Sequence, residues 1–577
     1  MDKEILDHLG EVSGETDLWC TYAAVRTYAW LGSIEKIKEP DSIINFLLSR
    51  QNSDGGYAWS VGMNSDAWAT YYCTQAIKSL ERSIAPSGEH CSCEKWLLNI
   101  QNPDGGFCMM PGQLSDVWAT YYAVRTLVEV CGRYPDASFK NWLSQLQSAD
   151  GGLTWSPAHS NYSTSDVRAC YYAITAWMVG TNNDQNVPWN KEKLTSWLRS
   201  QQSMNGGFKF QSKDDTDCLW ATFRATNALK LLDSSPVDTD KCINWIRGQL
   251  CQNSSFTRWP GYPIQDVWAA FCGIGSLKAL NVNTDDIAEN ITSIIKEFKV
   301  PEGGFTYREL PLASDTLSTA SKILSEHDNC KRNQQRIKWI EQCVMPNEDG
   351  IMYMPGRGSE VRCTLWSICA GAFKDSEEMK NRISTWLLES IQNPDGGFGY
   401  WEGRASDVIS TTAAIETIYT IKPEKLKTIR EKTLKFFNSC CTAEHLFSNV
   451  PNGKVSLRST LQALRAMSRL GVSPDTDLVH NVLLKYRVKG GGFANEGNRF
   501  PDLLSTYEAV LTSDIFNISV DTEHLIKFIN AIKLDNDTYS WTPLVKMNGG
   551  GIANCFGKNL DLRSVNLITS LPPVLIS

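Results

Sequence analysis

Two kinds of apolar pattern alternate along the chain, and together they predict pairs of helices. In one kind the apolar residues form a single face that ends in a Trp-Leu pair, as at Trp142 and Trp197. In the other kind, small and aromatic residues lie nearly all round the helix, as from Ala119 to Val124. A helix with few charged positions is buried on both sides, whereas a one-faced helix covers a core. Each unit is therefore expected to hold an outer amphipathic helix followed by a buried inner helix.

A turn with a glycine pair separates the two helices of most units, as at Gly105–Gly106 and Gly396–Gly397. Glycine supplies the left-handed backbone that ends a helix. A short polar loop follows, and then a Ser-Asp pair such as Ser115–Asp116, whose side chains can accept hydrogen bonds from the free amides of the next helix. These signals predict where each outer helix ends and each inner helix begins.

An acidic residue followed four places later by Thr marks each inner-helix start, and we call it the anchor. The copies are spaced 45 to 59 residues apart. A single helical pair cannot hide both its faces, whereas six pairs closed into a ring can. We therefore expect an all-α fold of two (α/α)6 toroids built from twelve hairpins, spanning residues 1–285 and 286–577, or with one barrel inserted in the other. The clear anchors are Asp17, Asp66, Asp116, Asp315, Glu360, Asp407 and Asp502, and the weaker ones are Asp166, Cys218, Asp266, Ser456 and Asp561.

Composition narrows the range of partners. The formal net charge is −8, which argues against broad binding to nucleic acid or to anionic membranes. No run of 18 apolar residues predicts a spanning helix, and the first ten residues do not resemble a secretory signal. Eighteen cysteines in such a chain are expected to be reduced, buried thiols, which indicates a cytoplasmic protein.

The repeat resembles that of a known superfamily. The motif Gln-x-x-Asp-Gly-Gly-Phe, at Gln101–Phe107 and Gln392–Phe398, is similar to the repeat of squalene and diterpene cyclases and of protein-prenyltransferase β subunits. The resemblance covers the whole chain, and two barrels in one chain are most similar to the two-domain class II terpene cyclases. The resemblance indicates the fold and not the reaction, because one scaffold hosts unrelated chemistries.

Two departures from these relatives bear on the chemistry. Zinc-dependent protein prenyltransferases need Asp and Cys two residues apart at one inner-helix start and His at the next, and no position two beyond an anchor is Cys here. We therefore expect no zinc site and no zinc-dependent prenyl transfer. Class II cyclases carry Asp-x-Asp-Asp-Thr, and the corresponding stretch here is Asp315 to Thr319, with Leu317 at the proton-donor position. A cyclase on this chain would need a non-standard acid.

The candidate acids are Asp217, Asp215 and Asp315. Three carboxylates lie within the four residues from Asp214 to Asp217, and like charges held together raise the pKa of at least one of them if they are buried. The structural alternative is a solvated loop whose acids cap the next helix. As a further alternative, the cluster could hold Mg²⁺ with Asp214 as a ligand.

The position two beyond the anchor divides the chain into halves. The first half has tryptophans there, which could form an aromatic wall for an isoprenoid and its carbocations or could pack between hairpins. The second half has arginines alternating with apolar residues. These arginines could seat a diphosphate near the helix N-termini or could form structural ion pairs. The expected substrate-binding residues are Trp68, Trp118, Trp220, Trp268, Arg362, Arg404, Arg458 and Arg563.

Three interpretations follow. The first is a class II-like terpenoid cyclase, an isomerase or lyase of isoprenoid biosynthesis, acting on a prenyl diphosphate or a prenylated substrate. The second is a non-catalytic protein that binds an isoprenoid or a partner on the same scaffold. The third is a structural repeat array whose barrels are filled with side chains. Conversion of an isoprenoid substrate would indicate the first interpretation, and binding without conversion would indicate the second. Barrels filled with side chains and without a cavity would indicate the third.

Overall fold

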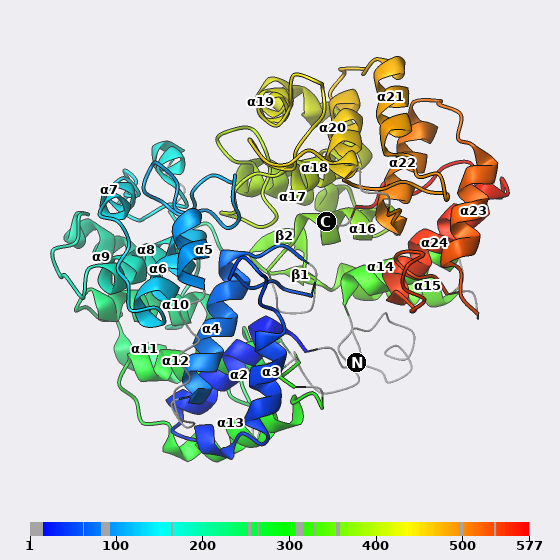
Figure 1. Ribbon diagram of the computed structural model, residues 1–577. Coiled ribbons are helices and arrows are strands. Elements are labelled where there is room, and N and C mark those ends of the chain that lie inside the picture. The colour runs from blue at the N-terminus through cyan, green and yellow to red at the C-terminus, as the bar shows by residue number, and fades with distance from the viewer. Residues whose placement is uncertain are drawn as a thin grey trace. The chain divides into compact units, whose positions relative to one another are not determined.

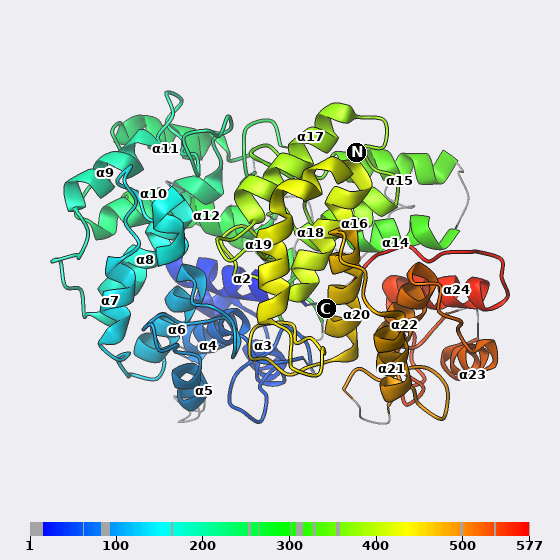
Figure 2. The same ribbon diagram turned by 90° about the horizontal axis from the view of Figure 1, so that it is seen from above.

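The computed structural model describes residues 16–61, 63–81, 93–162, 165–251, 255–262, 265–301, 303–306, 315–326, 331–353, 358–496, 500–535 and 538–575. Within these ranges the chain is helical, and its one sheet is a short antiparallel pair, β1 (Val344–Met345) and β2 (Glu348–Ile351) (Figures 1 and 2). The predicted all-α class is confirmed. No helix in this part of the chain is both long and apolar enough to cross a membrane.

The first unit, Ser13–Ala313, contains a closed ring of six inner helices. Each packs against the next in chain order, and α12 returns to pack against α2. The inner helices are α2 (Leu18–Trp30), α4 (Ala67–Glu81), α6 (Val117–Glu129), α8 (Val167–Gly180), α10 (Leu219–Leu231) and α12 (Val267–Ala279). The outer helices are α3 (Pro40–Leu48), α5 (Glu94–Asn99), α7 (Ser138–Ser144), α9 (Lys191–Ser200), α11 (Thr239–Gly248) and α13 (Asp285–Glu297), with short 3-10 turns η1 (Ile34–Lys36) and η3 (Pro157–Tyr162).

The second unit, from Ser314 to Ser577, repeats this plan. Its inner helices also close into a ring, because α24 packs against both α22 and α14. They are α14 (Thr316–Glu326), α16 (Val361–Cys369), α18 (Val408–Ile421), α20 (Leu457–Arg469), α22 (Leu503–Ile515) and α24 (Gly550–Ser564). The other helices of its described part are α15 (Lys331–Glu341), α17 (Glu377–Trp386), which continues into the π-turn η4 (Leu387–Ile391), α19 (Leu426–Ser439), preceded by η5 (Pro423–Lys425), α21 (Thr476–Tyr486) and α23 (Thr522–Ile532).

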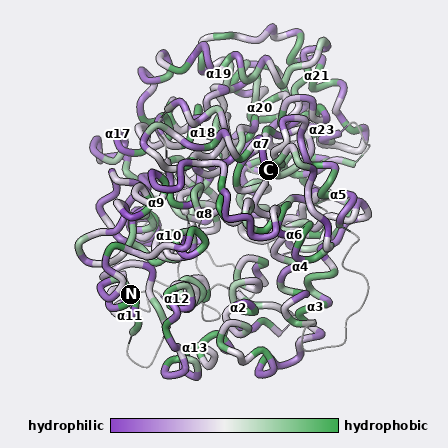
Figure 3. Tube along the Cα trace, turned by 90° about the vertical axis from the view of Figure 1, so that its left-hand side faces the viewer, coloured by the Kyte–Doolittle hydropathy of each residue, from purple (hydrophilic) through white to green (hydrophobic). Residues whose placement is uncertain are grey.

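The outer and inner helices differ in burial as the pattern predicts. On the outer helix α13 the buried residues include Ile287, Ile291 and Ile295, one per helical turn. Figure 3 shows hydrophobic and hydrophilic residues along α13. On the inner helix α12, by contrast, nearly every residue is buried. An inner helix therefore contributes to the core on all sides, whereas an outer helix covers the ring with one stripe.

The boundary between the units corrects the expected division at 285/286. Residues 285–306 belong to the first unit, because their glycine turn pairs with the first inner helix of the chain. The amide of Phe305 donates to Thr21 Oγ1 at 2.9 Å, and the amide of Asp17 donates to the Phe305 carbonyl at 3.0 Å. The first ring is thus closed by a segment that follows its last inner helix. Residues 1–15, on which an insertion of one barrel in the other would depend, lie outside the described residues.

The turn between outer and inner helix has the same form in the repeats that carry a glycine pair. In the third helical repeat, Gly105 has φ of +95°, and a Cβ on Gly106 would lie 2.6 Å from the Trp142 ring of the neighbouring outer helix. The first glycine therefore serves the turn and the second serves close packing. The amide of Phe107, just after the turn, donates to Thr120 Oγ1 at 3.1 Å. Equivalent bonds recur in both units, so a Thr at this position ties its inner helix to the turn before it.

The last inner helix begins earlier than the anchor pattern predicts. α24 starts at Gly550, and Asn554 occupies the place of the usual Thr, accepting the Tyr539 amide at 2.8 Å. The weaker anchor assigned to Asp561 is therefore wrong. Asp561 lies in the body of α24, because glycine and asparagine replace the Asp and Thr that identify the other copies.

Candidate functional site in the second ring

The anchor acids cap the inner helices. The carboxylate of Asp315, which is fully buried, accepts a hydrogen bond from the Ser318 amide at 2.7 Å. Asp116 does the same for Ala119 at 2.8 Å. Such caps satisfy amides that have no partner within the helix. The geometry of Asp315, predicted as a catalytic acid, is that of a cap shared with the other anchors.

Asp217 is explained by the repeat. In the third repeat Asn102 donates to Ser115 Oγ at 3.0 Å, and Ser115 Oγ donates to the carboxylate of Asp104 in the glycine turn. In the fifth repeat Ser203 takes the place of Asn102, and Asp217 takes the place of Ser115. The Ser203 hydroxyl donates directly to the Asp217 carboxylate. In the fifth repeat a hydroxyl thus stands at the place of Asn102 and a carboxylate at the place of Ser115, and the two are joined directly. This geometry favours the structural alternative over the predicted catalytic role.

The remaining acids of that cluster do not form a site together. The carboxylate of Asp214 is buried and accepts hydrogen bonds from the amides of Phe210 and Gln211 at 3.1 and 3.0 Å, which shapes the loop. Asp215 is exposed. Within the described residues no group of three or more His, Cys, Asp or Glu is arranged to hold a metal ion. Asp214 and Asp215 therefore lie in different surroundings, and the catalytic role expected for Asp215 and the Mg²⁺ role expected for Asp214 stay predictions.

The tryptophans of the first ring pack against one another. The Trp19 ring lies 5.7 Å from Trp68, 4.7 Å from Trp268 and 6.0 Å from Trp220, and Trp68 lies 5.8 Å from Trp118. α2 and α10 are not neighbours in the ring, so the Trp19–Trp220 contact spans its interior. All five side chains are buried. The packing favours the structural alternative for Trp68, Trp118, Trp220 and Trp268, and the binding role expected for them stays a prediction.

The predicted arginines separate into two groups. Arg362, just inside α16, pairs with Glu360 at 2.9 Å and lies over the Tyr400 ring at 4.2 Å. Arg404, in the loop before α18, and Arg458, on the first turn of α20, are half-buried and lie near the starts of successive inner helices.

Arg563 does not belong with them. It lies in the last turn of α24 and pairs with Asp514 at 2.6 Å. Its assignment to the helix-start ring is wrong, because it followed from the misplaced anchor at Asp561.

A buried group of charged residues lies deeper in the second ring, and we call it the polar cage. Arg465 on α20 is 0% exposed and lies 3.2 Å from Glu508 on α22, which is 3% exposed. Gln462 donates to the other Glu508 oxygen at 3.1 Å. On the next helix of the ring, Glu416 is buried and pairs with Arg469 at 3.3 Å. The cage thus joins three successive inner helices, α18, α20 and α22.

The electrostatics of the cage favour a protonated acid. Burial raises the pKa of the Glu508 carboxyl above its ordinary value, and the neighbouring Arg465 guanidinium opposes this only in part. None of the three guanidinium nitrogens of Arg465 makes a directed hydrogen bond to the described residues. Buried polar atoms normally have such partners, so the interior of this ring holds donors and acceptors that its own side chains leave unused.

Aromatic side chains lie beside the cage. Tyr507 precedes Glu508 on α22 and contacts Phe556 of α24 with ring centroids 4.4 Å apart. Trp366 of α16 contacts the same phenyl ring at 5.5 Å. Burial raises the pKa of Tyr507 well above its ordinary value, so its hydroxyl remains a donor. The arrangement places an acid, a cation and an aromatic wall on the inner face of one ring.

The cage could not be found from the position two beyond each anchor, where the candidate binding residues were sought. The cage residues lie six, nine and thirteen positions beyond, in helices read as wholly apolar. Charged residues such as Glu416 and Glu508 in otherwise apolar inner helices were the available signal.

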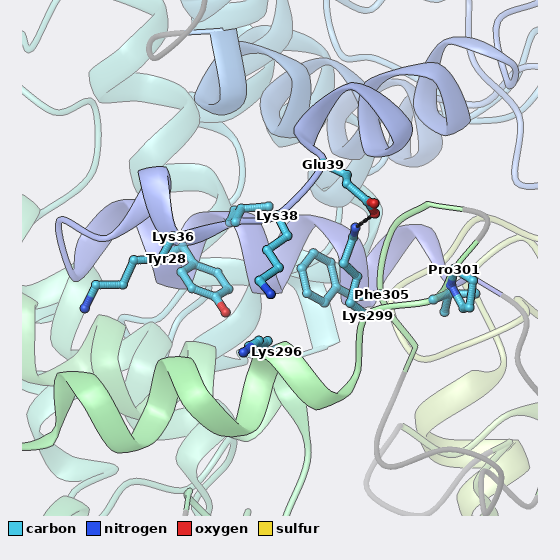
Figure 4. A pocket seen from close by; sticks show the side chains of 10 residues that line it. Tyr28, Lys36, Lys38, Glu39, Lys296, Lys299, Pro301 and Phe305 are labelled. Carbon is cyan, nitrogen blue, oxygen red and sulfur yellow. Dashed lines mark hydrogen bonds and ion pairs between the residues drawn. The ribbon is translucent and has the colours of Figure 1, made fainter.

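A second concave site lies in the first unit. A pocket of about 260 Å³ is lined by four lysines, from the turn after α2 and the end of α13, together with Tyr28 and Phe305 (Figure 4). Lys299 pairs with Glu39 at 2.7 Å. Lys36, Lys38 and Lys296 are exposed. Exposed lysines at a helix end are usually solvated and complement the helix dipole, so this pocket is a weaker candidate than the cage.

Comparison with known families agrees with the architecture. The profile of the prenyltransferase alpha-alpha toroid domain matches residues 7–83, 61–247, 178–315, 332–498 and 459–571. The chain belongs to this family. No curated protein matches it by sequence.

Solved structures show low similarity. ent-Copalyl diphosphate synthase from Streptomyces platensis is 12% identical, with 98% of this chain and 97% of that chain covered and a TM-score of 0.42. Candida albicans protein geranylgeranyltransferase-I, solved with GGPP, is 14% identical over 46% of this chain and 84% of its own, with a TM-score of 0.38. The type II terpene cyclase MstE from Scytonema is 15% identical over 48% and 88%, with a TM-score of 0.35. These identities and TM-scores assign no activity to the chain, and the family assignment rests on the profile match.

Proposed function

We propose that this family member is an isoprenoid enzyme, a class II-like terpenoid cyclase that uses Glu508 as its proton donor. The observation that carries the proposal is a buried carboxyl with a raised pKa on the inner face of a closed ring, beside aromatic side chains. A catalytic acid must keep its proton until an alkene needs it, and burial achieves this. Glu508 takes the role that the sequence analysis assigned to Asp217, Asp215 or Asp315.

In the proposed reaction, the Glu508 carboxyl gives its proton to one carbon of an alkene, and the other carbon becomes cationic. The π electrons of further double bonds then form the ring bonds, and loss of a proton from the final cation restores neutrality. Tyr507 and Phe556 would stabilise the cation through their ring faces. Arg465 stabilises the carboxylate left behind, because the two groups lie 3.2 Å apart. This combination holds the proton and still allows its release.

The substrate would be a prenyl diphosphate or a prenylated small molecule. Arg362, Arg404 and Arg458 lie near the starts of three successive inner helices, and their guanidinium groups favour anions. The anionic end is proposed to bind there, with Mg²⁺ as the cation that would accompany a diphosphate. No zinc is proposed for the reaction.

A second candidate is a binding protein without turnover. The Glu508–Arg465 pair and the hydrogen bond from Gln462 would equally suit a carboxylate that stays charged and only orients a ligand. Leu317 at the usual proton-donor position also fits this interpretation.

The test is incubation with geranyl, farnesyl and geranylgeranyl diphosphates, with and without Mg²⁺, and mass spectrometry of the products. A cyclised product that keeps its diphosphate, and that is lost in Glu508→Gln while substrate binding survives, is the expected result. Asp315→Asn is the matched control, because asparagine caps a helix as well as aspartate does. Unchanged turnover in Glu508→Gln refutes the proposed acid, and binding without conversion by the wild type favours the second candidate.

A further inference from the structure

The C-terminal segment lies against the inner face of the second ring. The Tyr507 hydroxyl donates to the carbonyl of Pro572 at 2.9 Å, and the Trp366 indole N–H donates to the carbonyl of Leu575 at 2.9 Å. Tyr507 belongs to α22 and Trp366 to α16, which stand opposite each other in the closed ring. A segment that bonds to both helices must lie across the ring.

The segment is buried although the chain leading to it is exposed. Leu571 is 4% exposed, Val574 0% and Leu575 1%, whereas Val565 and Leu567 in the preceding linker are 55% and 71% exposed. The buried part has no helix or strand. A segment outside the helices that is held by three apolar side chains and two hydrogen bonds can detach without unfolding the helices around it.

The groups that hold the segment are those proposed to receive a ligand. Tyr507 is next to the proposed acid Glu508, and Phe556 contacts both Tyr507 and Trp366. Prolines at 572 and 573 leave the segment few N–H groups, and both of its hydrogen bonds to the ring use carbonyl oxygens. The segment therefore presents what an oxygenated apolar chain would present, which is apolar bulk and oxygen acceptors.

We propose that residues 571–575 are a displaceable occupant of the second ring, which an apolar chain bearing oxygen acceptors must replace in order to bind. The inference rests on the proposed function, since it takes the second ring as the ligand site. The tail and the ligand then exclude each other. The apparent affinity of the full chain is lowered by the fraction of molecules whose ring is open.

The binding test uses the full chain and geranylgeranyl diphosphate as the probe, measured by titration calorimetry. Val574→Asp places a charge on a fully buried side chain of the tail and should release it, so the probe binds about tenfold more tightly than to the wild type. Leu567→Ser, in the exposed linker, is the matched control and leaves the affinity unchanged. Leu575→Asp is a second release variant, and circular dichroism confirms that both retain the helical fold. A synthetic peptide of residues 570–577 added to Val574→Asp should weaken probe binding again.

An independent readout follows the tail itself. Carboxypeptidase digestion of the wild type, read by intact mass, should stop before Leu575 without the probe and proceed to the prolines with it. Equal affinity in the wild type and both release variants, with digestion unaffected by the probe, overturns the inference and leaves the proposed function standing. Absence of probe binding in every variant overturns the proposed function and the inference with it.

Discussion

The bond between the anchor threonine and the glycine turn should be a main source of stability in each repeat. In the third repeat, Thr120 Oγ1 accepts a hydrogen bond from the Phe107 amide at 3.1 Å and donates one to the Asp116 carbonyl at 2.9 Å. Both Thr120 and Phe107 are fully buried. Thr120→Val keeps the shape of the side chain and removes the acceptor, so the Phe107 amide loses its partner in the core.

The expected cost follows from that orphaned donor. The Asp116 carbonyl keeps the hydrogen bond from the Thr120 amide at 3.0 Å, so only one polar group is left unsatisfied. A buried donor without a partner costs about 1–3 kcal/mol, and an isosteric change adds little from packing. We therefore expect Thr120→Val to lower the free energy of unfolding of the first unit by about 2 kcal/mol, within the range of that principle.

A matched control lies on the same helix. Thr126 is also fully buried, but its hydroxyl donates to the Tyr122 carbonyl at 2.8 Å, which already accepts a helical hydrogen bond. Thr126→Val should cost less than about 0.5 kcal/mol. Urea unfolding followed by tryptophan fluorescence reports mainly the first unit, because fifteen of the twenty tryptophans precede Ala313. Equal destabilisation by the two variants would refute the role given to the threonine–turn bond.

Two further predictions test the assignments of acids. Because burial raises the pKa of Glu508, protonation favours the folded state, and the stability from this group is present at low pH and is lost as the pH rises through the raised value. The unfolding free energy of Glu508→Gln minus that of the wild type should therefore increase with pH, and a difference independent of pH contradicts the shift. Asp217→Ser should cost about 1–2 kcal/mol through the lost charge-assisted bond, whereas adding Ser203→Asn and Asn205→Asp restores the arrangement of the third repeat and recovers most of the loss. A triple variant as unstable as the sum of its single changes, measured by urea unfolding, would show that the three side chains do not act as one set.

Much of the candidate site could not be predicted from the sequence. Spacing in the chain identifies only the anchor positions, which occupy equivalent places in the ring. Glu508 and Arg465 are 43 residues apart in the chain, and nothing in the sequence around either residue indicates that they lie in contact. Arg563 shows the opposite failure, because a chance acidic residue at 561 replaced the true start of α24 in the pattern.

The sequence by itself determined the elements of this protein. Glycine pairs, capping acids such as Asp116 and the contrast between one-faced and all-round apolar helices are local features, so they predict the hairpins and the all-α class. Tertiary structure alone decided which hairpin closes which ring. The Phe305–Thr21 bond joins residues 284 positions apart, and either ring could have used the same turn chemistry. It likewise decided which polar residues are buried together and where the C-terminal segment lies, because burial depends on which surfaces meet after the rings close.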